Sequence, residues 1–253
     1  MNTVSKQKML ALPDNRFLSK KVSSTAQGGF TLIEIAIVLV IIGLLLGGVL
    51  KGQELINTAR VRALNNTVDG VTAAWFSFQD RYRAFPGDYK QASINLPGAP
   101  TDGDGNGLVG STVAEAAERP NVWIHLAAAG YITGNFDEAP VAVDAYNCDV
   151  TTCPDNGFGA GMNLAYGTSV KGAAGADAHE LITGRGIPIE VIAELDRKVD
   201  DGVPRTGAMR LGANGTGWAV SDACERDETA TVGSFVYEVQ TPSSDCAAVF
   251  RNF

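Results

Sequence analysis

Apolar residues along the chain form two successive patterns, and one gives way to the other near residue 50. From Phe30 to Leu50 nearly every position is apolar, and Glu34 is the one charged residue among 21. A helix needs about 20 apolar residues to cross a bilayer. The first pattern therefore predicts a membrane-spanning helix over 30–50 with an acid near its start.

The second pattern continues the helix into a more polar stretch. Its apolar residues recur in alternating steps of four and three, which places them on one helix face. They are Leu64, Val68, Val71, Trp75, Phe78, Tyr82 and Phe85. The segment Phe85-Pro86-Gly87-Asp88 then stops the helix. We expect one helix from about Thr31 to Ala84, roughly 80 Å long, whose amphipathic part over 51–85 packs on a head.

Residues 86–253 are enough for one compact domain. Helices are expected around 122–129 and 189–198, and strands around 179–183, 208–211 and 232–239. Short strands among helices predict a small antiparallel sheet. The expected fold class is therefore α+β, with a long N-terminal helix packed on a globular head.

Charge divides the chain at the start of the apolar run. The first 29 residues hold five basic residues and one acid, a net charge of +4, so the remainder carries −12 in a chain whose total is −8. A basic segment before an apolar run is typical of a targeting region, and it keeps that end in the cytoplasm. The acidic remainder argues against nucleic acid as a partner.

Two ordinary explanations of the apolar run fit the residues poorly. A secretory signal peptide needs a small-residue cleavage site after the run, and Gly47-Gly48-Val49 is a poor candidate. A plain membrane anchor leaves Glu34 unexplained, although an acid in an apolar span is costly and usually has a task.

The segment Gly29-Phe30-Thr31-Leu32-Ile33-Glu34, between a basic stretch and an apolar helix, resembles the N-terminus of type IV pilins and pilin-like proteins. The resemblance covers about residues 20–60. It implies that a prepilin peptidase removes a leader, residues 1–29, by cutting after Gly29, and that it methylates the new N-terminus at Phe30. It also implies that Glu34 pairs with the N-terminal amine of a neighbouring subunit. An unpaired buried charge is costly, so this pairing would select the register of assembly.

The function implied by this resemblance is structural and not enzymatic. The chain would be a major or minor subunit of a type IV pilus, or fimbrium, built from itself and other pilins by an inner-membrane assembly platform with its ATPase. Its head would be periplasmic before assembly and extracellular in the filament. One alternative is a pseudopilin in the periplasmic pseudopilus of a type II secretion system. An alternative of another class is a membrane-anchored periplasmic binding module that shares only the leader.

Glycines interrupt the apolar run at Gly43, Gly47 and Gly48. Many pilins have a locally unwound helix in this part of the filament, and these glycines would permit unwinding here. Close packing of helices through small residues explains them equally well.

Four cysteines lie beyond the apolar run: Cys148, Cys153, Cys224 and Cys246. An even count in an exported region predicts two disulfides, and four cysteines allow three pairings. Local spacing favours Cys148–Cys153 and Cys224–Cys246. A metal site is a weaker interpretation because neither spacing is CxxC.

The clearest ligand motif in the head is Asp102-Gly103-Asp104-Gly105-Asn106-Gly107. Asp102, Asp104 and Asn106 place oxygen-bearing side chains on alternate residues, as in the first half of an EF-hand loop, and therefore predict a Ca²⁺ site. The twelfth position is Val113 instead of a glutamate, so Asp88, Glu115 or Glu118 would have to complete it. A surface turn rich in Gly and Asp is the alternative.

Nothing in the sequence forms a catalytic constellation. Its two histidines, His125 and His179, belong to no H-E-x-x-H pattern, and no G-x-S-x-G elbow, S-x-x-K box or P-loop is present. The group Asp196, Asp200 and Asp201 is interpreted as the polar end of a helix that runs into a Gly-Pro turn.

Overall fold

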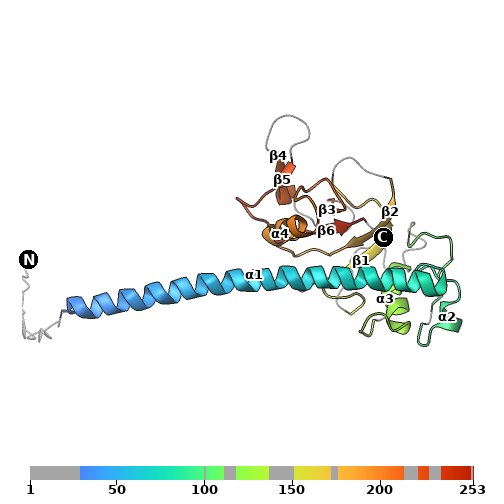
Figure 1. The fold of residues 1–253 in the computed structure, drawn as a ribbon, viewed down its shortest axis with the longest axis horizontal. Coiled ribbons are helices and arrows are strands. Elements are labelled where there is room, and N and C mark those ends of the chain that lie inside the picture. Colours follow the sequence, from blue (N-terminus) through green and yellow to red (C-terminus); the bar gives the residue numbers. More distant parts are fainter. Residues whose placement is uncertain are drawn as a thin grey trace, which may run out of the picture. The chain divides into compact units, whose positions relative to one another are not determined.

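The computed structural model describes residues 29–99, 101–110, 118–136, 151–171, 176–213, 222–227, 235–251 and 253. The chain separates into two compact units, Met1–Val49 and Leu50–Phe253. Helix α1, Leu32–Tyr82, begins in the first unit and ends in the second (Figure 1). The shorter elements, all in the second unit, are α2 (Ala92–Asn95), α3 (Glu118–Ala128), β1 (Asn163–Gly167), β2 (Ala178–Ile182), α4 (Ile189–Val199), β3 (Met209–Leu211), η1 (Asp222–Cys224), β4 (Glu225–Asp227), β5 (Phe235–Tyr237) and β6 (Ala248–Phe250).

The first part of α1 is apolar on all sides. Its most apolar 18-residue window has a mean hydropathy of 2.8, which is sufficient by length and composition for a membrane span. Within the part of the chain that the structure describes, none of that window is buried. The helix is continuous through Gly43, Gly47 and Gly48.

The amphipathic part of α1 supplies one wall of the hydrophobic core. The predicted stripe faces inward: Leu64, Val68, Val71, Trp75 and Phe78 are buried, and Tyr82 and Phe85 pack against them. The Trp75 ring contacts His179 of β2, and the Phe78 ring stacks with His125 of α3. This part of α1 therefore contacts both the sheet and α3 (Figure 1).

Helix α1 ends at Tyr82, two residues before the end expected at Ala84. The Arg83 N–H still donates to Gln79 O at 2.9 Å, but Arg83 has a φ of 55°, in the left-handed region. A residue in this conformation terminates a helix, and glycine usually occupies the position. The backbone thus turns before it reaches Phe85-Pro86.

The head contains a four-stranded antiparallel sheet with the strand order β1-β2-β6-β3. A two-stranded antiparallel ladder pairs β4 with β5. The α+β fold class expected from the sequence is confirmed. The expected helices correspond to α3 and α4, and the expected strands to β2, β3 and β5. β1, β4 and β6 were not predicted.

A disulfide joins Cys224, at the end of η1, to Cys246, just before β6. Cys153 is also disulfide-bonded. Cys148, its expected partner, lies outside the described residues.

Candidate functional site

Glu34 lies in the first turn of α1 and is bonded to the residue that precedes the helix. Its Oε2 accepts from the Thr31 backbone N–H at 2.8 Å and from the Thr31 hydroxyl at 2.9 Å. In return, the Glu34 N–H donates to Thr31 Oγ1 at 3.3 Å. This is a capping box, with Thr31 as the N-cap and Glu34 as the third helical residue. The carboxylate is also favoured by the positively polarised end of the helix.

The expected cleavage point, between Gly29 and Phe30, lies just before this capping box. The Phe30 side chain is 83% exposed. A Cβ added at Gly29 would meet no atom within 4 Å, so the fold itself does not require glycine there. A requirement for glycine would therefore come from a protein that acts on this segment. The rest of the expected leader lies outside the described residues.

In the head, His125 of α3 fastens the loop that carries the acidic motif. Its Nδ1 accepts from the Gly87 N–H at 2.9 Å, so the proton resides on Nε2, which donates to Thr101 O at 2.9 Å. Burial lowers the pKa of His125, which favours this neutral form. His125 is therefore a structural link between two loop segments.

Two glycines let these segments approach one another closely. Gly87 has a φ of 90°, and a Cβ there would lie 2.6 Å from Glu118 O. A Cβ at Gly103 would lie 2.2 Å from the carbonyl carbon of Asp88. Larger residues at either position would separate Asp88 from the Asp102–Gly107 loop.

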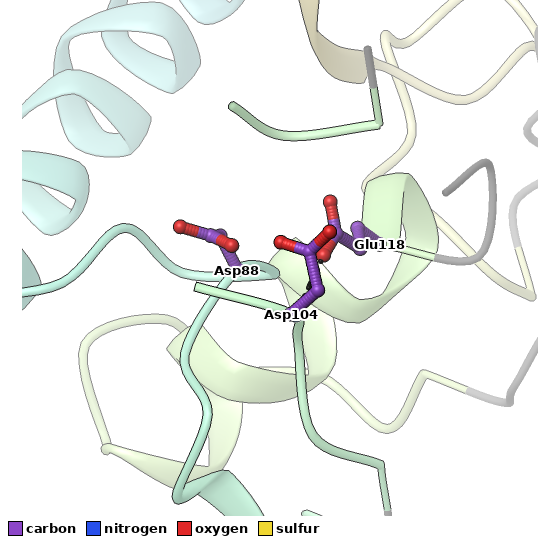
Figure 2. A group of neighbouring side chains, drawn as sticks. All are labelled: Asp88, Asp104 and Glu118. Carbon is purple, nitrogen blue, oxygen red and sulfur yellow. Dashed lines mark hydrogen bonds between the residues drawn. The ribbon is translucent and has the colours of Figure 1, made fainter. Parts of the chain in front are cut away.

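The result is a cluster of three carboxylates, Asp88, Asp104 and Glu118, here called the loop cluster (Figure 2). One oxygen from each lies within 4.8 Å of the others. Asp88 and Glu118 are buried, whereas Asp104 is exposed. The residues come from three segments: the turn after α1, the acidic loop and the start of α3.

Backbone N–H groups surround the loop cluster. Asp88 accepts from Asn106 N at 3.0 Å and from Gly107 N at 2.8 Å. Glu118 accepts from Asp104 N at 3.0 Å and from Gly110 N at 2.9 Å. Within the described part of the chain, no lysine or arginine forms an ion pair with any of the three carboxylates.

This uncompensated charge affects the protonation of the buried acids. Burial raises the pKa of Asp88, against the Gly107 N–H, which favours the charged form. Burial likewise raises the pKa of Glu118, and the nearby Asp104 and Asp88 act in the same direction. A bound cation would reverse the effect on both acids. Asp88 also lines a cavity of about 430 Å³, together with Gly105 and Gly107 of the acidic loop.

The three ligands expected from the sequence are not brought together as a set. Asp104 belongs to the loop cluster. Asp102 instead accepts from the Ser93 N–H at 2.7 Å and from its hydroxyl at 3.0 Å, and the Ser93 N–H lowers its pKa. The Asn106 side chain donates to Asp104 Oδ2 at 2.9 Å and accepts from Leu108 N at 2.7 Å, which makes it a turn-forming residue. Val113 and Glu115 lie outside the described residues.

Sequence reasoning overlooked one feature of each site. Thr31-x-x-Glu34 is the signature of a capping box and was readable in the sequence. Asp88 and Glu118 were named only as possible additions to the Ca²⁺ site. Their convergence depends on tertiary contacts through Gly87, Gly103 and His125, which no local spacing reveals.

Comparison with known proteins bears on the N-terminal segment alone. A family model described as the prokaryotic N-terminal methylation motif matches residues 24–50. The match includes Gly29, Phe30 and Glu34, together with the whole apolar run from Phe30 to Leu50. Neither the curated proteins nor the solved structures gave a significant match.

Proposed function

We propose that this chain, which carries the N-terminal methylation signature of type IV pilins and pseudopilins, is a structural subunit of a surface filament. The motif implies processing by a prepilin peptidase and assembly with other pilins. The apolar first part of α1 supports membrane anchoring before assembly. The observation that carries the proposal is the match at residues 24–50, centred on Gly29-Phe30 and Glu34.

The physical features of the first unit support this role. An apolar helix that the rest of its chain does not cover needs lipid or other apolar helices around it. Cleavage before the helix would leave both the helix and Glu34 in the mature protein. In the membrane-anchored subunit, the capping box would provide Thr31 as the hydrogen-bond partner of the Glu34 carboxylate. In a filament, the amine of a neighbouring subunit would replace or supplement that contact.

The experiment that tests this role compares two substitutions of Glu34. Glu34→Gln keeps an acceptor for Thr31 but removes the charge, whereas Glu34→Ala removes both. If pairing with an amine drives assembly, both variants accumulate in the membrane and at least roughly tenfold less protein reaches the sheared surface fraction. A matched control is Glu54→Gln, which changes an exposed acid of the same helix that pairs with Lys51.

The outcomes separate the alternatives. If Glu34→Gln assembles normally and Glu34→Ala does not, Glu34 serves as a helix cap and not as an ionic partner. If wild-type protein is processed but stays in the cell envelope, the chain is a pseudopilin. If processed wild-type protein never joins any filament, it is a membrane-anchored module.

We further propose that the loop cluster binds Ca²⁺ through Asp88, Asp104 and Glu118. These are hard oxygen ligands held on three segments, and a bound cation would neutralise carboxylates that have no ionic partner within the described residues. Such an ion would hold the turn after α1 against α3. Asp102 and Asn106 would support the loop without being ligands.

The test uses the full-length chain in detergent. Ca²⁺ should raise its melting temperature relative to chelator, because an ion that binds only the folded state stabilises it. Asp104→Asn should make this increase clearly smaller. Asp102→Asn is the matched control and should retain it, since Asp102 bonds to Ser93 and lies outside the cluster. Equal loss in both variants would contradict the assignment of ligands, and no response of the wild-type protein would contradict the site.

A further inference from the structure

A second group of acids lies at the C-terminal end of α4. Asp196 belongs to the last turn of the helix, Asp200 is its C-cap and Asp201 follows. One oxygen from each lies within 4.8 Å of the other two. We call this group the α4 cluster. The sequence predicted a helix end that runs into a Gly-Pro turn, and α4 does end here, with the Asp196 side chain completely buried.

The burial of Asp196 leaves one of its carboxylate oxygens poorly bonded. Oδ2 accepts from the Tyr237 hydroxyl at 2.7 Å, which connects α4 to β5. Oδ1 is buried and makes no hydrogen bond of normal geometry within the described residues, although the Gly202 N–H lies near enough to the carboxylate to lower its pKa. Buried polar atoms are nearly always bonded, and an exception requires an explanation such as a missing ion or proton.

The position of Asp196 near the C-terminal end of α4 raises the free-energy cost of its poorly bonded oxygen. The C-terminal end of a helix is negatively polarised and disfavours acids. Within the described residues, no lysine or arginine forms an ion pair with the α4 cluster, and Lys198 of the same turn pairs with Glu194. Arg210 is near enough to help lower the pKa of Asp201. Its Nε nevertheless donates to Gly207 O.

The other two acids are held firmly in place. Asp200 Oδ2 accepts from the Met209 and Ala208 N–H groups, which binds the helix end to the start of β3. Asp201 accepts from the Val203 N–H at 2.9 Å and from the Thr206 hydroxyl. These bonds fix the two carboxylates beside Asp196, although like charges repel.

We propose that Asp196, Asp200 and Asp201 bind a hard divalent cation of the Ca²⁺ type, with Asp196 Oδ1 as its buried ligand. An all-oxygen set of carboxylates favours such a cation over softer metals. The ion offsets the charge of the cluster and the polarity of the helix end. It also joins α4, the 200–209 turn and, through Tyr237, strand β5. This inference does not depend on assembly into a filament.

A proton is the competing explanation for the unpartnered oxygen. Burial raises the pKa of Asp196 to about 6, and Asp201 and Asp200 act in the same direction. A protonated Asp196 would need no metal. The two explanations differ in what Ca²⁺ does near pH 7.5, where most of such an acid is ionised.

The experiment uses full-length protein in detergent with the Asp104→Asn substitution, which disables the loop cluster. Calorimetric titration with Ca²⁺ should show one site, and Ca²⁺ should raise the melting temperature. Adding Asp196→Asn should weaken binding at least roughly tenfold and remove the thermal shift. In chelator the same variant should melt at or above the parent's temperature, because it retains an acceptor for Tyr237 and removes a buried charge.

A second variant distinguishes the loss of a ligand from misfolding of the protein. Asp201→Asn changes an exposed ligand and should also weaken binding of Ca²⁺, with normal melting in chelator. The proposal is overturned if the Asp104→Asn parent binds no Ca²⁺ at pH 7.5, or if both added substitutions leave its affinity unchanged. The first result would mean that the ionised Asp196 carboxylate is held near neutral pH without a bound cation.

Discussion

The two parts of α1 share one helical backbone but differ in what surrounds their apolar side chains. Between residues 32 and 49 the apolar side chains are exposed with respect to the described residues, and added Cβ atoms at Gly43, Gly47 and Gly48 would meet nothing within 4 Å. Between residues 61 and 78 one face is buried in a core that the chain itself supplies. The first part therefore depends on surroundings outside the chain, whereas the second depends on the head.

Polar groups differ between the regions in the same way. The one acid of the apolar segment has only Thr31 as a partner within the described residues, and the ionic partner that we propose for it belongs to a neighbouring subunit. The head buries several acids and supplies partners for most of them. Glu225, for example, pairs with both Arg205 and Lys171. The exceptions are the loop cluster and the α4 cluster, where we propose cations.

The largest difference between the regions should appear when large side chains are truncated. Trp75→Ala removes a fully buried ring that contacts Phe85, His179 and Phe253. It should destabilise the head by about 3–5 kcal/mol. Leu39→Ala, at a position 63% exposed, should leave the unfolding of the head unchanged. Denaturant unfolding of full-length protein in detergent measures both effects. An equal loss would mean that the regions are not energetically separate.

Removal of the Cys224–Cys246 disulfide should weaken the head and leave the apolar segment intact. The bond closes a loop with a sequence separation of 22. Loop-closure entropy implies a loss of about 3 kcal/mol in a Cys224→Ser/Cys246→Ser variant. Thermal unfolding measures this loss, and N-terminal mass analysis should show unchanged processing in cells. Failure of processing would indicate that the peptidase requires a folded head.

Acid should destabilise the head through His179. Burial lowers the pKa of this histidine to about 4. Below its ordinary value near 6.5 the unfolded chain binds a proton that the native state excludes, so stability falls as the pH drops from 6.5 to 4, by up to about 3 kcal/mol. His179→Phe keeps a ring among Phe85, Trp75 and Tyr166 but does not titrate.

The measurement is the difference between the two stability curves as a function of pH. The variant also loses the hydrogen bond from the Val109 N–H, at 3.3 Å. This loss should lower the variant's stability by the same amount at every pH, so it does not contribute to the difference in slope. Asp196 changes the free energy of unfolding with the opposite sign between pH 3.8 and about 6. Because it is present in both proteins, its effect cancels in the difference. Parallel curves would contradict a buried neutral His179.

The smallest expected effect is at the end of α1. Arg83→Gly relieves a left-handed residue with a φ of 55° and should stabilise the head by about 1 kcal/mol. Its ion pair with Asp80 is exposed on both sides and contributes little. Arg83→Ala is the matched control, because it loses the same ion pair but keeps the strained backbone. Equal melting temperatures for the two variants would refute this explanation.

Most of α1 was predictable because neighbouring residues of the sequence alone specify it. Apolar length, a period of four and three, and the Pro-Gly stop specify a helix without reference to the rest of the chain. Gly29-Phe30 and Glu34 were readable for the same reason. Strands β1, β4 and β6 were missed although they are no shorter than the predicted strands, because they are defined by partners elsewhere in the chain.

The acidic sites were predictable only in part. The alternation of Asp102, Asp104 and Asn106 suggested a self-contained loop, but Ser93 holds Asp102 and the turn uses Asn106. The α4 cluster was interpreted only as a polar helix end, because sequence does not show that Tyr237, 41 residues away, donates a hydrogen bond to Asp196. Burial and long-range partners decide such sites, and local composition does not reveal them.

The most direct test of the central claim is the mass of the N-terminal peptide in protein recovered from sheared surface material and, separately, from membranes. The account predicts a chain that starts at Phe30 with a methylated amine and is present in the sheared fraction. A chain that starts beyond Leu50, with the apolar segment removed, would contradict it, because no helix would remain to anchor or assemble the subunit.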